Sequence, residues 1–265
     1  MDEPPRQVDL AVLGAGPAGG EAAIAAAEAG LRVAVIDEAT EAGGQVWRAP
    51  SYKPTEADIS ASPDLAAGHS LRHRLAESGA ELLFGHRLWF ANRDLDLVVA
   101  GPGGQVQLLA GALVIAAGTT ERLVPVPGAT LPGVVGLAAT TIFLKSHAVV
   151  PGGRVLVAGV GPLLYAVAAG ICAGGGQVAA VVDLARPSDW AAHLPAIATR
   201  PDLLLRGLGW IRRLASARVP LYFGHTVTAI EGGDRVRAAR LSAVDRQWQP
   251  VGPERALAVD TVAIG

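Results

Sequence analysis

The opening of the chain groups apolar and polar positions in a way that predicts a strand, a turn, a helix and a second strand. Asp9–Leu13 is a short, mainly apolar run, which is typical of a buried strand. After a glycine-rich turn, Glu21–Ala29 is rich in alanine and favours a helix. Gly30 ends that helix, and Leu31–Ile36 forms a second apolar run that finishes at Asp37. The pattern predicts a β–α–β unit with parallel strands.

The glycines of this turn have the spacing of a dinucleotide-binding motif, G-x-G-x-x-G. The first glycine permits the tight turn, the second lets backbone N–H groups approach a pyrophosphate, and the third lets the helix pack close to the strand. The helix N-terminus attracts phosphate charge, and an acid at the end of the second strand can accept hydrogen bonds from ribose hydroxyls. That acid follows the third glycine by 18 positions, close to the expected ~20. The candidate cofactor-binding residues of this unit are Gly14, Ala15, Gly16, Pro17, Ala18, Gly19, Asp37 and Glu38.

The same pattern returns in the second half of the chain. Gly159 and Gly161 match the first two glycines at a constant offset of 145 positions. Leu164 replaces the third glycine, so we expect helix and strand to lie further apart and the pyrophosphate cradle to be altered. Whether this second unit binds a nucleotide stays open. Asp183 would favour NAD through its 2′-hydroxyl, whereas Arg186 could instead favour a 2′-phosphate.

Other candidate cofactor contacts accompany the first unit. Two adjacent glycines after the second strand indicate that backbone passes close to a ligand. Beyond them an arginine could contact phosphate and a tryptophan could cover a ring; the alternative is a surface turn with a half-buried tryptophan. The apolar strand Ala112–Ala116 ends in a small residue and a glycine, which fits backbone passing beside a nucleotide at a strand's carboxyl end. The residues concerned are Gly43, Gly44, Gln45, Trp47, Arg48, Leu88, Ala117 and Gly118.

Two such units predict an α/β protein with two Rossmann-like, three-layer dinucleotide-binding domains, the second inserted in the first. We assign residues 1–123 to the first domain, 124–258 to the inserted domain, and 259–265 to the start of a return into the first, the remainder being absent. The rest of the pattern predicts a loop over Pro54–Pro63, one strand over Glu81–Phe90, helices over Asp64–Ser78, Ala138–His147 and Leu203–Ala217, and a last strand over Ala256–Ile264.

Composition and charge exclude several other classes of function. Hydrophobic residues make up 51% of the 265 residues and charged residues 17%, which suits buried parallel sheets. The net charge is −2 and Lys and Arg form no stripe, so nucleic-acid binding has no electrostatic footprint. The single cysteine, Cys172, excludes an intrachain disulfide or Cys-x-x-Cys couple and favours a small buried side chain. His69 and His73 lack a third ligand, so we expect no metal site.

The chain also lacks the patterns of secreted and membrane proteins. Its first five residues show no basic region followed by an apolar core, so we expect no signal peptide and a cytoplasmic location. Val155–Val182 carries no charge, but its glycines and Pro162 fall at turn positions. A buried strand–helix–strand unit therefore explains this stretch better than a membrane span.

These motifs resemble those of the two-dinucleotide-domain flavoproteins of the pyridine nucleotide-disulfide oxidoreductase superfamily. Three stretches, G-G-Q-V-W-R at Gly43, F-L-K-S-H-A-V-V-P-G-G-R-V-L-V-A-G-V-G-P-L-L at Phe143 and V-P-L-Y-F-G-H-T-V at Val219, are similar to the A-type subunits of bacterial amine dehydrogenases. That group includes subunits of opine oxidase, hydrogen cyanide synthase and proline or hydroxyproline dehydrogenase. The resemblance implies FAD in the first unit and NAD(P), or another adenine nucleotide, in the second.

The resemblance also implies an FAD-dependent oxidoreductase that oxidises a CH–NH bond in a small-molecule redox substrate, an opine or an amino acid. A catalytic flavoprotein partner subunit would carry most of the dehydrogenating site, and we identify no catalytic residue in this chain. The chain departs from the superfamily's disulfide reductases in lacking a Cys pair, which excludes thiol–disulfide exchange. It also stops at Gly265 without the cysteine-rich iron–sulfur region of the amine-dehydrogenase subunits, so it looks like a shortened member. Two alternatives stay open: a stand-alone NAD(P)H-dependent flavin reductase, and a non-catalytic nucleotide-binding scaffold.

Overall fold

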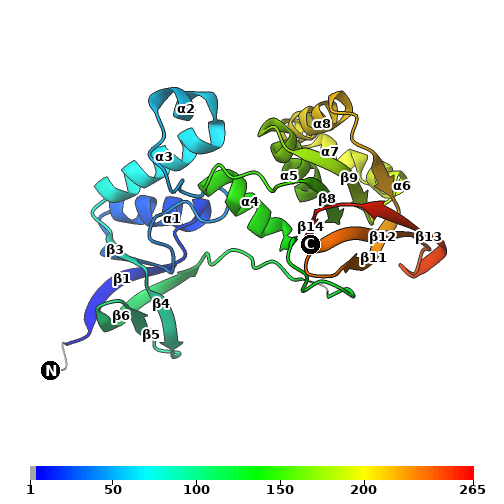
Figure 1. The fold of residues 1–265 in the computed structure, drawn as a ribbon. Helices are drawn as coiled ribbons and strands as arrows, with labels where there is room; N and C mark the ends of the chain where they lie inside the picture. Colours follow the sequence, from blue (N-terminus) through cyan, green and yellow to red (C-terminus); the bar gives the residue numbers. More distant parts are fainter. Residues whose placement is uncertain (1–3, 124) are drawn as a thin grey trace. The chain divides into compact units, whose positions relative to one another are not determined.

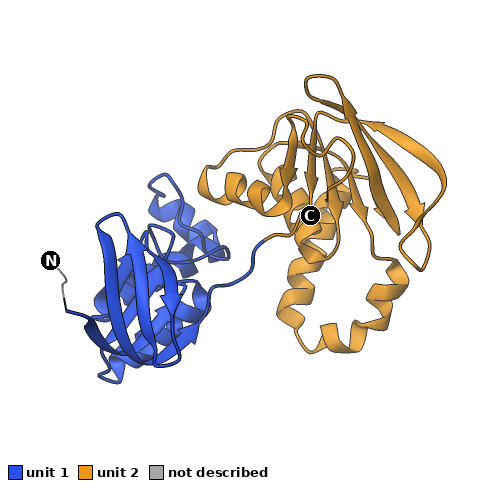
Figure 2. Ribbon diagram, turned by 90° about the horizontal axis from the view of Figure 1, so that it is seen from below, with its two compact units in different colours: residues 1–120 blue, residues 121–265 orange. Residues whose placement is uncertain are grey.

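The chain folds into two compact units, which divide between Thr120 and Glu121 (Figure 2). This computed structural model describes residues 4–123 and 125–265. Val124, at which we started the second domain, lies outside the described residues, and the ranges 1–123 and 124–258 stay a prediction. Each unit has its own parallel strands and its own hydrophobic cores.

Unit 1 is built on a six-stranded sheet with the strand order β3-β2-β1-β6-β5-β4 (Figure 1). Strands β3, β2, β1 and β6 run parallel, and β5 runs antiparallel to both β6 and β4. The elements are β1 (Arg6–Leu13), α1 (Pro17–Glu28), β2 (Val33–Asp37), α2 (Glu56–Ala61), α3 (Pro63–Glu77), β3 (Glu81–Phe84), β4 (Arg87–Ala91), β5 (Asp96–Gly101) and β6 (Gly104–Ile115).

Two hydrophobic cores cover the two faces of the parallel strands. On one face, Ile24 of α1 and Leu71 and Leu75 of α3 pack against β1 and β2. On the other face, Leu97 and Val99 of β5 pack against the same strands. Side chains that alternate along each parallel strand therefore enter opposite cores, and unit 1 has three layers.

Unit 2 contains a five-stranded parallel sheet with the order β10-β9-β8-β14-β7 and a three-stranded antiparallel sheet with the order β11-β12-β13. Its elements are β7 (Val134–Gly136), α4 (Leu137–Ser146), β8 (Arg154–Gly159), α5 (Pro162–Ala173), β9 (Gln177–Asp183), α6 (Pro187–Ala192), α7 (Leu194–Ala198), α8 (Pro201–Ser216), β10 (Leu221–Phe223), β11 (His225–Gly232), β12 (Val236–Val244), β13 (Pro250–Ala258) and β14 (Thr261–Ile264).

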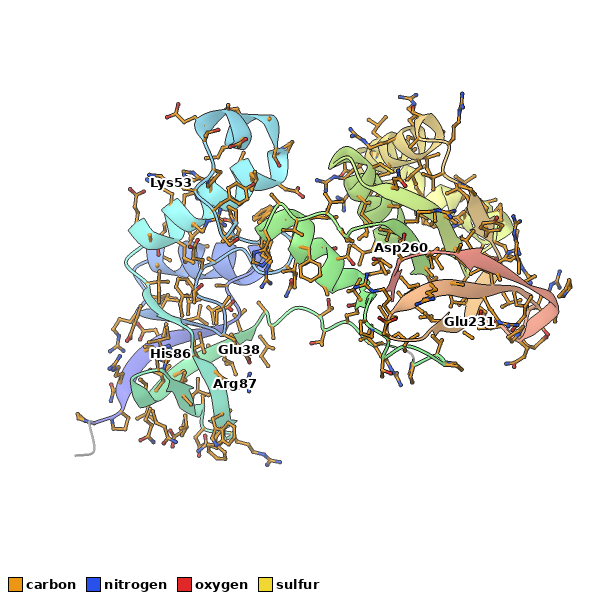
Figure 3. The ribbon with its side chains drawn as sticks, in the orientation of Figure 1. Glu38, Lys53, His86, Arg87, Glu231 and Asp260 are labelled. Carbon is orange, nitrogen blue, oxygen red and sulfur yellow. The ribbon has the colours of Figure 1, made fainter. Side chains whose placement is uncertain are left out.

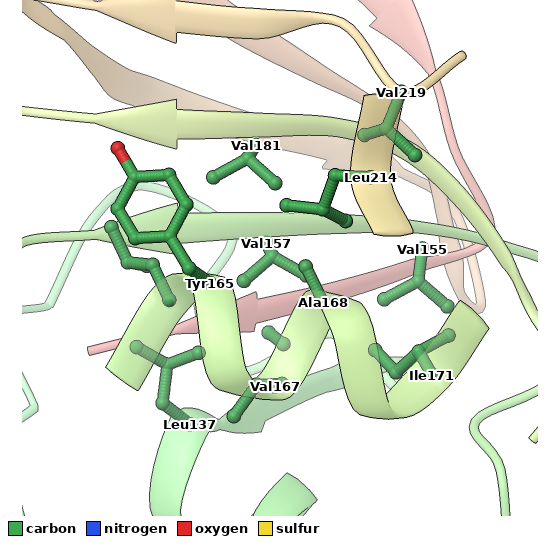
Figure 4. Close-up of a cluster of buried hydrophobic side chains, with 12 residues drawn as sticks. Leu137, Val155, Val157, Tyr165, Val167, Ala168, Ile171, Val181, Leu214 and Val219 are labelled. Atoms are coloured by element: carbon green, nitrogen blue, oxygen red, sulfur yellow. The ribbon is translucent and has the colours of Figure 1, made fainter. Parts of the chain in front are cut away.

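Helices and the antiparallel sheet cover opposite faces of the parallel sheet in unit 2. Ile171 of α5 and Leu214 of α8 pack against Val157 of β8 on the helical face (Figure 4). Ile230 and Leu241 of the antiparallel sheet close the other face. Both units are therefore Rossmann-like α/β structures with three layers, which confirms the predicted fold class.

The last strand of the given sequence, β14, belongs to the parallel sheet of unit 2, and the return into the first domain that we assigned to residues 259–265 stays a prediction. In β14, Val262 lies in parallel register opposite Leu156 of β8 and Val134 of β7. Val262 and Ala263 are fully buried. An apolar run that is buried on both faces completes this sheet.

Three predicted elements are divided differently in the structure. Glu81–Phe90 forms two strands, because Gly85 turns the chain between β3 and β4. The predicted strand Ala256–Ile264 is likewise interrupted between β13 and β14. The predicted loop before α3 contains the short helix α2, whose start is capped reciprocally by Thr55 and Asp58. No residue of α2 is buried, so the hydrophobic pattern could not reveal it.

Candidate functional site

The glycine turn joins β1 to α1 with backbone packing that only glycine permits. Gly14 has φ +97°, and a Cβ there would overlap the carbonyl of Ala116 at the end of β6. A Cβ on Gly19 would overlap the Gly14 carbonyl oxygen, so the helix begins directly against the turn. Pro17 lies in the first turn of α1, and the N-cap residue, Gly16, makes no side-chain cap. The first N–H groups of α1 are therefore available to an anion.

The loop after β2 lies against the same turn. The Gly43 N–H donates to the Ala15 carbonyl oxygen at 2.8 Å. A Cβ on Gly44 would lie 2.9 Å from Gly16 Cα, so there is no room for a side chain. This contact brings the predicted glycine pair beside the N-terminus of α1.

The acid at the end of β2 is held by two backbone donors. One carboxylate oxygen of Asp37 accepts the N–H of Ala15 at 2.6 Å, and the other accepts the N–H of Ala39 at 2.7 Å. The side chain is only half-buried, and each oxygen has a second lone pair for a further donor. Asp37 is thus oriented at the position where an acid binds ribose hydroxyls in dinucleotide-binding folds.

Four other predicted contacts border this region. The Arg48 guanidinium donates to the Gln45 side-chain oxygen at 3.1 Å, on the loop that follows the glycine pair. Ala117 and Gly118 are exposed just beyond the carboxyl end of β6, which lies beside the glycine turn. These residues belong to the two loops whose backbone lies against the turn at Gly44 and at Ala117.

Three predicted contacts have side chains engaged elsewhere in unit 1. Trp47 packs against the helix-side core, which is the half-buried alternative considered above. Leu88 of β4 packs against the opposite core. Glu38 forms a bidentate ion pair with Arg87, in which the guanidinium nitrogens Nε and Nη2 lie 2.8 and 2.9 Å from the two carboxylate oxygens (Figure 3). The hydrogen bonds from Arg87 lower the pKa of the Glu38 carboxyl below its ordinary value. These three side chains contribute to the fold of the unit, and their contact with a cofactor stays a prediction.

The matching turn of unit 2 has a different geometry. A Cβ on Gly159 would overlap the carbonyl oxygen of Gly265 at the end of β14, so the first glycine is again required. Gly161, the N-cap of α5, has φ +90°, whereas its counterpart in unit 1 has φ −68°. Leu164, which replaces the third glycine, is 0% exposed and packs in the helix-side core. A whole leucine side chain thus fits at the position where unit 1 has no room for a methyl group.

In unit 2, the two residues expected to recognise the ribose or its 2′-phosphate, Asp183 and Arg186, form hydrogen bonds within the unit. Asp183 is 1% exposed and accepts the Tyr165 hydroxyl at 2.6 Å. Burial, together with this hydrogen bond, raises the pKa of Tyr165 above its ordinary value, so the hydroxyl stays protonated and donates. The Arg186 guanidinium donates to the Val244 carbonyl oxygen at 2.5 Å.

A repeated turn that the hydrophobic pattern did not reveal follows β3 in unit 1 and β10 in unit 2. Its sequence is F-G-H, at 84–86 and again at 223–225. In both copies the histidine Nδ1 lies 2.7 Å from the phenylalanine carbonyl oxygen. The glycine N–H donates to the carbonyl oxygen of the second residue after the acid, Ala39 at 2.9 Å and Ala185 at 3.0 Å. The repeated F-G-H motif is the sequence signal by which this turn could have been predicted.

The single cysteine is expected to react slowly in the folded chain. Cys172 lies on α5, and burial raises the pKa of its thiol above the ordinary value. Because the thiolate is the reactive form, we expect a disulfide reagent to modify the folded chain at least about tenfold more slowly than the unfolded chain at mildly alkaline pH. The release of coloured thiol measures both rates, and equal rates would contradict the burial of this side chain.

The sequence of the chain matches the model of a known family. The model of the pyridine nucleotide-disulphide oxidoreductase family matches residues 8–264. The chain belongs to this family. FAD and NAD(P) are the cofactors of the family, and its members are oxidoreductases. In this family member, the turn at 14–19 together with Asp37 is the candidate dinucleotide site.

The curated relatives of this family member include subunits of larger enzymes. The HcnB subunit of hydrogen cyanide synthase from Pseudomonas protegens is 33% identical over 96% of this chain and 55% of its own length. The opine oxidase A-subunit of Rhizobium meliloti is 37% identical over 81% of this chain and 48% of its own length. The chain therefore spans about half the length of these curated relatives, and both belong to the group that its sequence resembles.

Two solved structures share the fold of this chain. Thioredoxin reductase of T. acidophilum has a TM-score of 0.67 at 19% identity, with 98% of this chain and 76% of that chain covered. L-proline dehydrogenase from P. horikoshii has a TM-score of 0.59 at 18% identity, with 100% and 43% covered. At these identities the likeness establishes the fold alone.

Residues 4–123 and 125–265 hold neither a membrane-crossing helix nor a cluster of metal ligands. None of the helices formed there combines the length and the apolar character that crossing a membrane requires. The same described residues bring together no set of three or more His, Cys, Asp or Glu side chains suited to a metal ion.

Proposed function

We propose that this chain is the FAD-binding, electron-transferring part of a multi-subunit oxidoreductase that acts on the CH–NH bond of an opine or amino acid. The observation that carries the proposal is the glycine turn of unit 1, which leaves the N-terminus of α1 available to an anion beside Asp37. The names of the curated relatives support the subunit role and the substrate class.

The residues of unit 1 fit FAD. Backbone N–H groups of the turn at 14–19 and of the first turn of α1 would hold the pyrophosphate. The Asp37 carboxylate, already oriented by two backbone donors, would accept hydrogen bonds from the adenosine ribose. Gly44, Gln45 and Gly118 would border the flavin. The bound flavin supplies the redox chemistry, and the residues of this chain bind it and orient it.

We assign the dehydrogenating site largely to a partner flavoprotein subunit. The curated relatives are named as subunits, and this chain matches about half of their length. None of the described side chains is assigned here as the base that takes a proton from the substrate. In this arrangement the partner binds the amine, and unit 1 receives the electrons.

The purified chain is expected to carry FAD. Its visible absorbance should show flavin bands, and heat release followed by chromatography should yield FAD in an amount equimolar with the chain. The backbone packing of the glycine turn is the physical reason, because it presents N–H groups to a pyrophosphate. A folded but colourless chain that takes up no added FAD would overturn the proposal and favour a nucleotide-binding scaffold.

The source of the electrons separates the subunit from a stand-alone reductase. With its partner subunit present, an opine or amino acid should bleach the flavin under anaerobic conditions, and the isolated chain should respond far more slowly. Robust NADH oxidation by the isolated chain would overturn the subunit role.

A further inference from the structure

The acid of unit 2 is enclosed by side chains of its own unit. Tyr165, near the start of α5, donates its hydroxyl to one carboxylate oxygen of Asp183 at 2.6 Å. The N–H of Ala185 donates to the other oxygen at 2.9 Å. Trp190 of α6 lies edge-on to the tyrosine ring, with the ring centroids 6.1 Å apart. Figure 4 shows the Tyr165 ring on α5 with its hydroxyl pointing away from the aliphatic cluster, and only 1% of the Asp183 surface is exposed.

The corresponding positions of unit 1 leave the acid accessible. Counted from the first glycine of each turn, the residue that matches Tyr165 is Gly20. Gly20 has no side chain that could reach the acid, and Asp37 takes its two hydrogen bonds from backbone N–H groups instead. Asp37 is half-buried, whereas Asp183 is fully buried. A ribose hydroxyl can therefore reach the acid of unit 1 but not that of unit 2.

Arg186, the cation that could recognise a 2′-phosphate, also forms hydrogen bonds within unit 2. The Arg186 guanidinium donates to the Val244 carbonyl oxygen of β12 at 2.5 Å, and the Arg186 backbone N–H donates to Asp189 at 2.8 Å. The arginine side chain runs over the repeated turn, where a Cβ on Gly224 would lie 3.2 Å from Arg186 Cγ. Arg186 thus ties the loop after β9 to the antiparallel sheet, and its charge is not directed at a phosphate.

We propose that Tyr165 closes the ribose position of unit 2, so that this unit does not bind NADH or NADPH. The family's nicotinamide cofactor then does not fit the residues of unit 2, although the unit keeps the β–α–β plan. It follows that the flavin receives its electrons from an organic substrate or a partner subunit, a statement that rests on the proposed function. The closure itself concerns unit 2 alone, and the FAD content of unit 1 is measured separately by absorbance.

Nucleotide binding to the FAD-saturated chain tests the proposal directly. Saturating unit 1 with FAD removes the competing site, so any further uptake belongs to unit 2. Equilibrium dialysis against NADH, NADPH and ADP-ribose is expected to show no saturable binding up to about 1 mM. Saturable binding of NADH or NADPH below that concentration would overturn the proposal, whatever the result for FAD.

Removal of the Tyr165 side chain should allow unit 2 to bind a nucleotide at the ribose position. Tyr165→Ala removes the ring and exposes the Asp183 carboxylate, so we expect saturable binding of ADP-ribose with a Kd at least about tenfold below the 1 mM limit, or 1.4 kcal/mol. Tyr222→Ala is the matched control, because the Tyr222 ring lies in the same unit but packs with His225 and Arg255. Unchanged affinity in a Tyr165→Ala chain whose circular dichroism matches that of the wild type would overturn the role of this side chain.

A second variant gives a readout that involves no nucleotide. Tyr165→Phe keeps the ring over the acid but removes the donor to a buried carboxylate oxygen. A buried acceptor left without its donor destabilises a fold, so we expect the midpoint of thermal unfolding to fall by about 3–8 °C. Tyr222→Phe should shift it much less. An unchanged midpoint for Tyr165→Phe would contradict the bond on which the closure rests.

Discussion

The Gly19→Ala variant is expected to lose nearly all affinity for FAD. The added methyl group would overlap the Gly14 carbonyl oxygen, which is backbone and cannot rotate aside. The start of α1 must therefore move away from β1, and its N–H groups move with it. Since the proposed function assigns the pyrophosphate to those groups, we expect the affinity for FAD to fall at least about 100-fold, or about 2.7 kcal/mol. Titration of the apoprotein with FAD, followed by flavin fluorescence, measures the change.

Gly103→Ala is the matched control for this variant. Gly103 lies in the exposed turn between β5 and β6 of the same unit, and a Cβ there would meet no atom within 4 Å. This variant should bind FAD like the wild type. Overpacking at Gly19 itself costs about 1–3 kcal/mol, so circular dichroism should still report the α/β fold. Wild-type affinity in a folded Gly19→Ala chain would show that FAD does not lie on this turn.

Restoring the third glycine to unit 2 is expected to weaken the fold and not to create a cofactor site. Leu164 is 0% exposed and packs in one cluster with Leu137, Val157 and Val167. Leu164→Gly empties that volume, which costs about 2–5 kcal/mol for comparable truncations, and a glycine within a helix costs about 1 kcal/mol more. We therefore expect the free energy of unfolding to fall by about 3–6 kcal/mol. Urea unfolding followed by circular dichroism measures the loss.

Leu163→Gly separates the burial of this side chain from the effect of glycine on the helix. Leu163 is the neighbouring residue of α5 and is 44% exposed. Its replacement lowers helix propensity equally but leaves no enclosed cavity, so the expected loss is about 1–2 kcal/mol. Equal losses for the two variants would mean that Leu164 contributes no more to the core than an exposed leucine does.

The two β–α–β units could be predicted from sequence because each signal in them is local. An apolar run followed within three residues by a glycine turn predicts β1 and β8, and Asp37 and Asp183 fall at the ends of the next strands. The start of β1 was missed by three residues, since Arg6 and Gln7 are polar positions at the edge of the run. The short helix α2 was missed because capping, and not an apolar face, begins it.

The closure of unit 2 could not be predicted because it depends on residues that meet only in three dimensions. Tyr165 stands in an apolar helix, where the pattern favours a core side chain, and most of its ring does lie in the core. Only the fold shows that its hydroxyl meets an acid 18 positions away. Arg186 is similar, since its partner, the Val244 carbonyl, lies 58 positions further along the chain. For Trp47 the sequence allowed two roles, covering a cofactor ring or packing as a half-buried side chain. In the structure Trp47 packs against the helix-side core of unit 1, as in the second role.

The F-G-H turn is present in both units with the same backbone hydrogen bonds, so the two units of this chain can be compared with each other. The two units share the first glycine of the glycine turn and the F-G-H turn. We assign both features to the common scaffold, because they are present in the unit with a buried acid as well as in the unit with an accessible acid. The two units differ at the third glycine position and the residue after it, where Gly19 and Gly20 of unit 1 correspond to Leu164 and Tyr165 of unit 2. Among homologues, substitutions at the shared positions should therefore track loss of folding, and substitutions at the divergent pair should track a change of cofactor.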